Sequence, residues 1–264
     1  MMTFRLSEAE HRYGPRVHIL SDPCMASWLA RLCSPSTFQP QINSLVESLY
    51  SSLVKTVMNA EFPRQRAIVP TRMTALHPKA PLDTEILETE QRVVTVNLAR
   101  AGTLPSHVCY QLLNTTMNPQ QIRQDHILAS RLTDESDHVT GVSLSGAKIG
   151  GDVQNAIVLF PDPMGATGHT IISALNHYKN VVGGKACKYL ALHLIVTAEY
   201  LKNVLSAHPD LSIYAVRLDR GLSPHDVLQT VPGTRWNEER GLNDKHYIVP
   251  GGGGFGEIMN NSFV

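Results

Sequence analysis

The sequence predicts an α/β fold built on a mainly parallel, twisted sheet that helices flank on both sides. The first observation is a series of β-branched and aliphatic runs at residues 93–98, 156–160, 189–197 and 211–216. The second is that helical patterns separate these runs, and strands that alternate with helices are typical of parallel sheets. Ligands of such sheets bind at the carboxyl ends of the strands, so the loops after the strands are the places to search for a site.

Two stretches carry apolar residues at the spacing of an amphipathic helix. In the first, at residues 41–58, one stripe contains Ile42, Leu45, Val46, Leu49, Leu53, Val54 and Val57. The second helix is expected around residues 171–178, with two glycines beyond its end at residues 183–184. Residues 132–151 are polar and rich in glycine, which indicates a long hairpin or flap.

The composition is that of a folded domain, and its charge is balanced. The chain has 264 residues, of which 42% are hydrophobic and 17% are charged, so a sizeable core can form. Its 23 basic and 23 acidic residues balance, and nothing indicates general nucleic-acid binding. No apolar run is long enough to span a membrane, the first residues are unlike a signal peptide, and a cytoplasmic location is expected. The four cysteines and twelve histidines lack the spacing of a zinc site.

The segment of residues 156–170 combines an apolar strand, a loop of small residues and the start of a helix. This arrangement binds phosphate, because unpaired N–H groups and the positive end of a helix converge in one turn. Gly165 and Gly168 would let the chain approach an anion closely, and the hydroxyls of Thr167 and Thr170 would add hydrogen bonds. The alternative is an ordinary strand-to-helix turn.

This loop resembles that of the uracil phosphoribosyltransferase family, in which a strand leads into Asp-Pro-Met-Leu-Ala-Thr-Gly-Gly-Ser/Thr. Here the loop reads Asp-Pro-Met-Gly-Ala-Thr-Gly-His-Thr from Asp162 onward. Three further segments are similar to the family in order and spacing, at residues 93–102, 208–214 and 247–251. The resemblance spans residues 90–258 and is weak near the N-terminus. It implies a type I phosphoribosyltransferase fold with a hood formed by the N- and C-terminal segments.

The resemblance also implies one phosphoribosyltransferase domain over residues 1–264. Its expected parts are a helical N-terminal extension, a core, an additional segment, and a base-binding loop with the C-terminus, at residues 1–65, 66–222, 223–242 and 243–264 respectively. The family passes almost directly from Asp-x-Gly-Leu to Tyr-Ile-x-Pro-Gly, whereas this chain inserts the additional segment. That segment is either a surface excursion or a lid or subunit contact that brings a carboxylate to the base.

The activity that the resemblance implies is transfer of a phosphoribosyl group from phosphoribosyl diphosphate (PRPP) to uracil, with Mg²⁺ held mainly by the substrate and by no protein ligand. The expected catalytic residues are Asp162, which would accept hydrogen bonds from the sugar, and Arg100, whose planar guanidinium suits diphosphate. The alternatives are a surface salt bridge for Arg100, a solvated loop charge for Arg131 and a solvent-facing side chain for His169. The expected PRPP contacts are Arg100, Arg131, Asp162, Pro163, Met164, Gly165, Ala166, Thr167, Gly168, His169 and Thr170.

The base is expected to contact backbone groups of Ile248, Gly253, Gly254 and Phe255, with the Phe255 ring suited to the base face. The family reads Gly-x-Gly-Asp-x-Gly-Asp at this place, and the present chain reads Gly-Gly-Gly-Gly-Phe-Gly-Glu. Gly254 therefore replaces the first Asp, and Glu257 can stand in only for the second. The loss of a carboxylate near the ribose and the metal leaves base identity and catalytic rate open.

Three other functions are compatible with the sequence. One is a sensor that binds PRPP or a nucleotide without turnover, a second is a transferase for another base, and a third is an RNA-binding attenuator, which the neutral charge disfavours. A carboxylate from Glu238, Glu239 or Glu257 would compensate for Gly254 and keep the chain active. The expected partners are PRPP and uracil, with no nucleic acid or membrane, and the chain is expected to form a homo-oligomer, a dimer or a tetramer.

Overall fold

The computed structural model describes residues 4–133 and 139–263, and within this part it describes the side chains outside residues 129–144. The strands are β1 Val17–Ile19, β2 Arg64–Val69, β3 Leu82–Leu87, β4 Val93–Ala99, β5 Ile122–Thr133, β6 Val139–Lys148, β7 Ile157–Pro161, β8 Met164–Gly165, β9 Lys188–Thr197 and β10 Ser212–Asp219. The helices are α1 Pro23–Leu32, α2 Gln41–Glu61, α3 Thr103–Thr116, α4 His169–Asn180, α5 Ala198–Ala207, α6 His225–Leu228 and α7 Phe255–Ile258, with 3₁₀ turns at Pro119–Gln121 and Trp236–Glu238.

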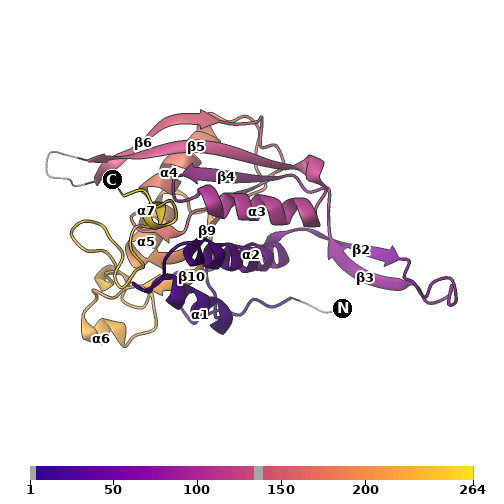
Figure 1. Cartoon of the computed structure of the whole chain (residues 1–264), viewed down its shortest axis with the longest axis horizontal. Coiled ribbons are helices and arrows are strands. Elements are labelled where there is room, and N and C mark those ends of the chain that lie inside the picture. The colour runs from indigo at the N-terminus through magenta and orange to yellow at the C-terminus, as the bar shows by residue number, and fades with distance from the viewer. Residues whose placement is uncertain (1–3, 134–138, 264) are drawn as a thin grey trace.

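The main sheet runs in the order β1-β10-β9-β7-β4-β5-β6, and β8 pairs with β9 beside this path (Figure 1). Its strand pairs are parallel except for β5 with β6. In the register, Val93 of β4 lies between Ile157 of β7 and Ile122 of β5. The predicted α/β fold with a mainly parallel sheet is confirmed, and the carboxyl ends of β4, β7, β9 and β10 share one edge.

Helices cover both faces of this sheet, and each face has its own hydrophobic core. Helices α1, α2 and α3 pack on one face, while α4 and α5 pack on the other. Central strands are therefore buried on both sides, which explains why β7 reads as an unbroken apolar run. The amphipathic helix predicted at residues 41–58 is α2, and its Leu49, Leu53 and Val54 side chains are fully buried.

The region expected to be a helical N-terminal extension is part of the core. Its α2 helix supplies much of the first hydrophobic core, and the Tyr50 hydroxyl donates a hydrogen bond of 3.1 Å to the Leu192 carbonyl of β9. Strand β1, which periodicity did not reveal, pairs with β10 and extends the sheet. No helix among the described residues combines the length and apolar character that crossing a membrane requires.

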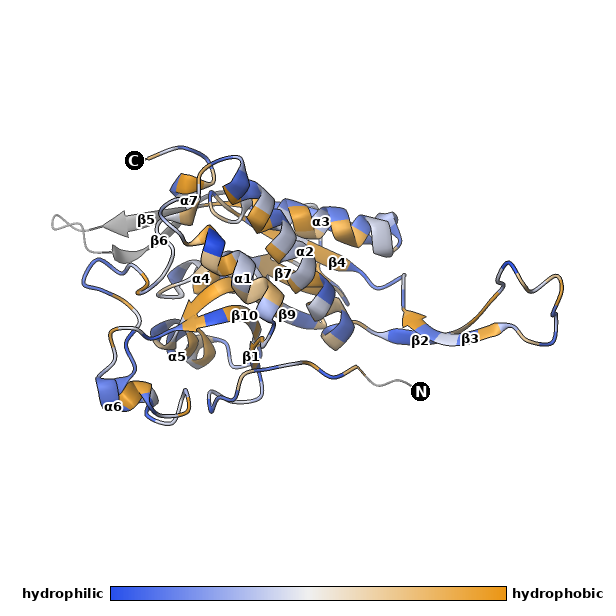
Figure 2. Cartoon of the chain, turned by 60° about the horizontal axis from the view of Figure 1, so that its bottom comes forward, coloured by the Kyte–Doolittle hydropathy of each residue, from blue (hydrophilic) through white to orange (hydrophobic). Residues whose placement is uncertain are grey.

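A two-stranded arm projects away from the body. Strands β2 and β3 pair only with each other, antiparallel, and Figures 1 and 2 show them extending from the ends of α2 and β4. We call residues 64–87 the arm. The sequence did not reveal it, because strands exposed on both faces lack the alternation of buried and exposed residues by which a strand is recognised.

The hairpin expected at residues 132–151 is formed by β5 and β6, which pair antiparallel beyond β4. It begins earlier than predicted, because β5 starts at Ile122. Arg131 lies in β5 opposite Val142. Its side chain falls outside the described residues, so its expected contact with PRPP stays a prediction.

The predicted hood is built by the α1–α2 connection together with the C-terminal segment. Gln39 Nε2 donates to the carbonyls of Ile258 and Met259, at 3.2 and 3.0 Å. Cys33, at the end of α1, lies against Gly252, since a Cβ built there would be 2.7 Å from its Sγ. These contacts hold the C-terminal loop over the first hydrophobic core.

Candidate active site

The loop between β7 and α4 is fastened to the protein on its α5 side. Thr197 Oγ1 donates to the Ala166 carbonyl at 2.8 Å, and Asn203 Nδ2 donates to the Thr167 carbonyl at 3.0 Å. Helix α4 follows Gly168, which has a φ of 89° and cannot cap the helix with a side chain. The first N–H groups of α4 lack intrahelical acceptors. An anion placed here would meet these N–H groups and the positive end of the helix.

Both glycines of this loop are required by close packing. A Cβ on Gly165 would lie 2.8 Å from Val196 Cγ1, and one on Gly168 would lie 2.5 Å from Val204 Cγ2. The Tyr200 ring also lies against both positions, 3.2 Å from the Cβ built on Gly165 and 3.5 Å from the Cβ built on Gly168. The sequence suggested that these glycines let an anion approach the chain. The structure shows that a side chain at either position would collide with β9 or α5. The loop is thereby pressed onto a rigid support.

A buried polar chain supports the strand end at Asp162. The ring nitrogens of His193 contact the Asp162 carbonyl and the Tyr200 hydroxyl, each at 2.5 Å. The carbonyl can only accept, so Nδ1 carries the proton and Nε2 accepts from Tyr200. Burial lowers the pKa of His193 to about 4, and its hydrogen bond to Asp162 only partly opposes this. His193 is therefore neutral at pH 7 and holds one tautomer.

The depressed pKa of His193 predicts that it makes the fold acid-sensitive. Its folded pKa lies below the ordinary value of 6.5, so its contribution to stability is present above pH 6.5 and is lost as the pH falls toward 4. From pH 7 to pH 5 the native protein should lose about 2 kcal/mol of unfolding free energy through this group alone. The His193→Asn variant should be less stable than the native protein at pH 7. Between pH 7 and pH 5, however, its unfolding free energy should fall by about 2 kcal/mol less than that of the native protein.

Urea denaturation at the two pH values measures this difference. His225→Asn, which changes an exposed histidine of α6, is the control and should keep the native pH dependence. An equal loss of stability in native protein and His193→Asn would show that the buried imidazole is not the group that titrates.

Two of the expected PRPP contacts, Pro163 and Met164, also anchor the loop on β9. The Pro163 carbonyl accepts from the N–H groups of Leu194 and Ile195, at 3.0 and 3.1 Å, and proline has no N–H of its own. Met164 pairs with Ile195 in β8 and packs against the first hydrophobic core. Both residues therefore anchor the loop on β9, and their expected contact with PRPP stays a prediction.

Arg100 stands at the end of β4 with an exposed side chain. Its Nη1 donates to Ser262 Oγ at 2.9 Å and to the Ser262 carbonyl at 3.2 Å. The turn after it is tightly packed on β7, since a Cβ on Gly102 would lie 3.0 Å from the Pro161 carbonyl oxygen. Among the described residues no carboxylate pairs with Arg100, so the salt-bridge alternative finds no support in this part of the chain. The turn that bears Arg100 thus lies beside the end of β7, where the loop from Asp162 begins.

The predicted base loop lies next to Arg100, but its phenylalanine is not free to stack on a base. Phe255 is 2% exposed and belongs to the first hydrophobic core, so the expectation of a ring on the base face is wrong. Helix α7 begins at this residue, and a Cβ on Gly256 would lie 3.6 Å from Ala101. Ile248 is also buried, and Gly253 is exposed with a φ of 83°. The loop can offer backbone groups, as predicted, but no aromatic face.

Glu257 occupies the place that a side chain at Gly254 would take. A Cβ built on Gly254 would lie 2.0 Å from Glu257 Oε2. Within the described part of the chain the Glu257 carboxylate has no hydrogen bond or ion pair, and its side chain is partly exposed. A carboxylate is therefore present at the position where the family pattern has Asp, although it comes from three residues further along.

The additional segment, residues 223–242, does not bring a carboxylate to this place. Glu239 is 1% exposed and accepts hydrogen bonds from Tyr13 Oη, Arg220 Nη1 and the Gly233 N–H. Glu238 pairs with Arg235 on the surface. Of the three carboxylates considered from the sequence, the structure leaves Glu257. The segment is a packed extension of the body rather than a free excursion, and Trp236 Nε1 bonds the Ala198 carbonyl at 2.8 Å.

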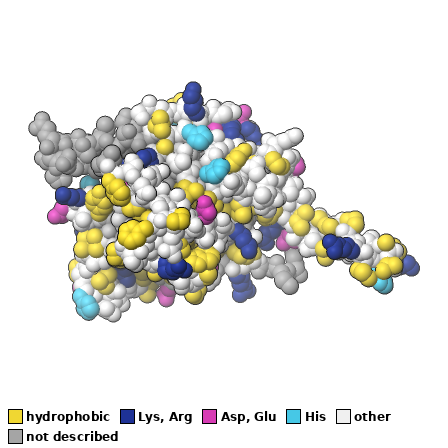
Figure 3. All heavy atoms as spheres, in the orientation of Figure 1, with side chains coloured by type: hydrophobic (Ala, Val, Ile, Leu, Met, Phe, Trp, Pro, Cys, Tyr) yellow, Lys and Arg dark blue, Asp and Glu magenta, His cyan; other side chains and the backbone are white. Residues whose placement is uncertain are grey.

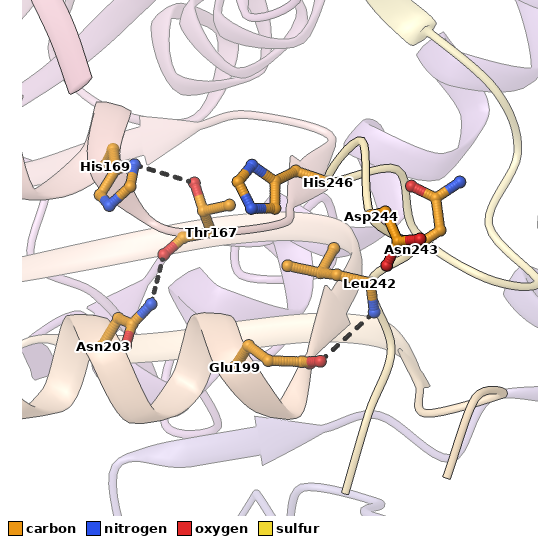
Figure 4. A pocket seen from close by; sticks show the side chains of 8 residues that line it. All are labelled: Thr167, His169, Glu199, Asn203, Leu242, Asn243, Asp244 and His246. Atoms are coloured by element: carbon orange, nitrogen blue, oxygen red, sulfur yellow. Dashed lines mark hydrogen bonds between the residues drawn. The ribbon is translucent and has the colours of Figure 1, made fainter. Parts of the chain in front are cut away.

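A cavity of about 600 Å³ opens beside the loop between β7 and α4 (Figure 4). It lies between the start of α4, the start of α5 and a turn that follows the additional segment. Glu199 fixes this turn by accepting the N–H groups of Gly241 and Leu242, at 2.9 and 3.3 Å. The lining residues are Thr167, His169, Glu199, Asn203, Leu242, Asn243, Asp244 and His246. His169 therefore faces the cavity, and Thr167 lies 3.4 Å from its Nδ1.

Sequence reasoning missed several residues of this site. His193, Tyr200 and Asn203 support the loop from β9 and α5, and Ser262 contacts Arg100. Most of these contacts join residues more than 30 positions apart, and that of His193 with Tyr200 depends on how β9 and α5 meet, so no local pattern marks them.

Comparison with known proteins agrees with this geometry. A family model described as "Uracil phosphoribosyltransferase" matches residues 19–235. The chain belongs to this family. The match begins much nearer the N-terminus than the resemblance found by motifs and includes α1 and α2, which belong to the first hydrophobic core. The base loop at residues 248–255 lies beyond the matched residues.

Two curated relatives show how far sequence similarity reaches. The uracil phosphoribosyltransferase of Acinetobacter baylyi is 37% identical over 83 residues, which are 31% of this chain and 36% of the relative. That of Agrobacterium fabrum is 35% identical over 103 residues, which are 39% of this chain and 38% of the relative. The chain thus matches little more than a third of the length of these relatives.

One solved structure supports the fold over nearly the whole chain. The AQ2163 protein from Aquifex aeolicus superposes with a TM-score of 0.68 at 20% sequence identity, covering 92% of this chain and 97% of that protein. At this level of identity the similarity concerns the fold alone.

Proposed function

We propose that the protein transfers the 5-phosphoribosyl group of PRPP to uracil, giving UMP and diphosphate. The observation that carries the proposal is the loop between β7 and α4, which ends in a helix start without a side-chain cap and begins at the strand end on which the turn after Arg100 packs. Membership of the uracil phosphoribosyltransferase family supports the reaction, as do two relatives that carry this name.

In this proposal each part of the site binds one part of PRPP. The N–H groups around Gly168 hold the 5′-phosphate, and Asp162 orients the ribose hydroxyls. The C1′–oxygen bond to diphosphate breaks while the bond from C1′ to uracil N1 forms, and the N1 proton passes to solvent. Arg100 stabilises the charge that collects on diphosphate, so catalysis depends on positioning and electrostatics rather than on a side-chain base. Arg131 and the β5–β6 hairpin are proposed to close over the donor and exclude water.

Mg²⁺ is proposed as the cofactor, with diphosphate supplying most of its ligands. Among the described residues no three His, Cys, Asp or Glu side chains are grouped so as to hold a metal ion. The site does contain carboxylates, Asp162 and Glu257, and Mg²⁺ prefers such oxygen ligands while retaining several from substrate and water. When bound, the ion would neutralise charge on the leaving diphosphate.

Base recognition is proposed to rest on backbone groups of Ile248, Gly253 and Gly254, with a carboxylate supplied by Glu257. The partly exposed position of this carboxylate and its lack of a partner in the described residues favour such a role. A sensor that binds PRPP without turnover is the second candidate, and the observation that favours it is the absence of a side chain at Gly254. Cytoplasmic location is retained as part of the proposal.

A direct assay separates these candidates. Purified protein would be incubated with PRPP, Mg²⁺ and one of uracil, cytosine, adenine, guanine or hypoxanthine, and diphosphate release would be measured. Uracil should give the highest rate. Thr167→Leu is the control for the site, because it adds bulk where the loop lines the cavity but leaves the Thr167 carbonyl free to bond Asn203. PRPP binding by calorimetry without release from any base would instead establish the sensor.

The arm provides a surface for the expected homo-oligomer, and we propose that it packs on a second copy of the chain. An isolated two-stranded hairpin is marginally stable in water. The arm nevertheless exposes large apolar side chains, and Figure 3 shows hydrophobic atoms along it. Ile68 is 69% exposed and Leu76 is 72% exposed. Burial of these side chains in a dimer would stabilise both the arm and the assembly.

Replacing Ile68 and Leu76 together by serine should weaken this assembly. The oligomer should dissociate at a protein concentration about tenfold higher than for the native chain, because apolar area is lost from the interface. Sedimentation velocity over a concentration series measures the change. Phe38→Ser is the matched control, since Phe38 is 70% exposed but lies off the arm. A monomeric native protein, or equal dissociation of the control, would refute the proposed contact.

A further inference from the structure

Two strands of the sheet carry the same charged pair. In β10, Arg217 Nε and Nη2 donate to the two oxygens of Asp219, at 2.7 and 2.8 Å. In β5, Arg123 makes the same fork to Asp125, at 2.9 and 3.0 Å. Residues two apart lie on one face of a strand, which allows this geometry. The aspartate side chains are 2% and 0% exposed, so each pairing neutralises a buried charge.

Each pair also fastens a glycine loop through the main chain. The Gly251 N–H donates to Asp219 Oδ2 at 2.8 Å, and its carbonyl accepts from Arg217 Nη2 at 2.8 Å. At the other pair, the Gly150 N–H donates to Asp125 Oδ1 at 2.9 Å, and the Gly151 carbonyl accepts from Arg123 Nη2 at 3.2 Å. We call each pair with its glycine loop a clamp. The clamp of Arg217 and Asp219 lies at the carboxyl end of β10, at the edge of the sheet that carries the candidate site. The clamp of Arg123 and Asp125 lies near the start of β5, at the opposite edge.

The glycine held by β10 determines the course of the base loop. Gly251 has a φ of 61°, and a Cβ there would lie 2.2 Å from the Ile248 carbonyl oxygen, so the chain turns sharply at this residue. The next residue, Gly252, packs against Cys33 and the Phe255 ring. The backbone between Ile248 and Gly254 therefore starts from a point that Arg217 and Asp219 fix at both its N–H and its carbonyl.

We propose that Arg217 and Asp219 are positioning residues for base recognition. This inference rests on the proposed function, in which backbone groups of the loop contact the base. Recognition by backbone groups needs them in place before the base arrives, since ordering a glycine-rich loop on binding would cost affinity. Arg217 is the central member, because its planar fork holds the carboxylate and the Gly251 carbonyl at once. A lysine ammonium has no such fork.

The test compares Arg217→Lys with Arg123→Lys, the same substitution in the matched pair. Arg217→Lys should raise the KM for uracil about tenfold and leave the KM for PRPP within about twofold. Arg123→Lys should leave both KM values within about twofold, while thermal unfolding reports the stability that each variant loses. Hydrogen exchange gives a second readout, with faster exchange at residues 248–254 in Arg217→Lys and at residues 150–153 in Arg123→Lys.

The outcomes separate this inference from the function on which it rests. An equal rise of the uracil KM in both variants, or unchanged exchange at residues 248–254 in folded Arg217→Lys, would overturn the positioning role while native turnover upheld the function. Native protein that turns over no base would overturn the proposed function, and the role of the clamp in base recognition with it.

Discussion

Arg100→Lys should reduce the rate of diphosphate release by about 10- to 100-fold, with PRPP binding weakened less than turnover. The charge is retained, but the planar fork that can bind two diphosphate oxygens is lost. The fold should survive, because Arg100 is exposed and its side chain bonds only Ser262 among the described residues. Steady-state assays with saturating uracil and varied PRPP measure the effect.

Arg92→Lys is the matched control for this prediction. Arg92 lies just before β4, at the opposite end of the strand from Arg100, and pairs with Asp152 on the surface. Its replacement should leave turnover within about twofold of the native value, as expected for an exposed ion pair. Native turnover in Arg100→Lys would show that this arginine does not act on diphosphate.

The sequence predicted the parts of the fold that burial dictates. The apolar run at residues 156–160 became β7, since a strand covered on both faces must be apolar throughout. The stripe at residues 41–58 became α2, whose apolar face is buried in the first hydrophobic core. The arm was missed because Ile68 and Leu82 are exposed, so their positions follow no burial pattern.

The candidate site was predictable where a local pattern carries the chemistry. The residues from Asp162 to Thr170 read as a strand, a small-residue loop and a helix start, and the structure has these elements in this order. The support of that loop by His193 and Tyr200 was not predictable, because it depends on how β9 and α5 meet. The repeated Arg-x-Asp spacing at residues 123–125 and 217–219 was visible, but only the structure shows which loop each pair holds.

The burial of Phe255 was likewise hidden from the sequence. A phenylalanine after a glycine run is compatible with a stacking platform and with a core anchor. The choice depends on α1 and α2, which lie more than 190 residues earlier and belong to the same hydrophobic core as the ring. Because Phe255 is buried, the side-chain contact that the loop can offer to the substrates is the carboxylate of Glu257 rather than an aromatic face.

Glu257→Gln should lower turnover with uracil about tenfold or more, because it removes the charge that we assign to the place of the family Asp. Gly254→Asp alone should give no gain. Its side chain would enter the space of Glu257 Oε2, which lies 2.0 Å from the position of the added Cβ. The glutamate end can swing away, but two carboxylates would then share one site and each would disfavour ionisation of the other.

The decisive variant is the combination of Gly254→Asp with Glu257→Gln, which moves the carboxylate back to residue 254. It should recover much of the activity lost in Glu257→Gln, and the coupling between the two changes should be about 1 kcal/mol or more in a double-mutant cycle. Glu238→Gln is the control for a surface carboxylate, and it should leave turnover unchanged because Glu238 is exposed and only pairs with Arg235. A clear gain from Gly254→Asp alone would show that the site lacks a carboxylate and that Glu257 does not supply one. Additive effects in the cycle would show that the two positions do not share a role, since residues that replace one another must couple.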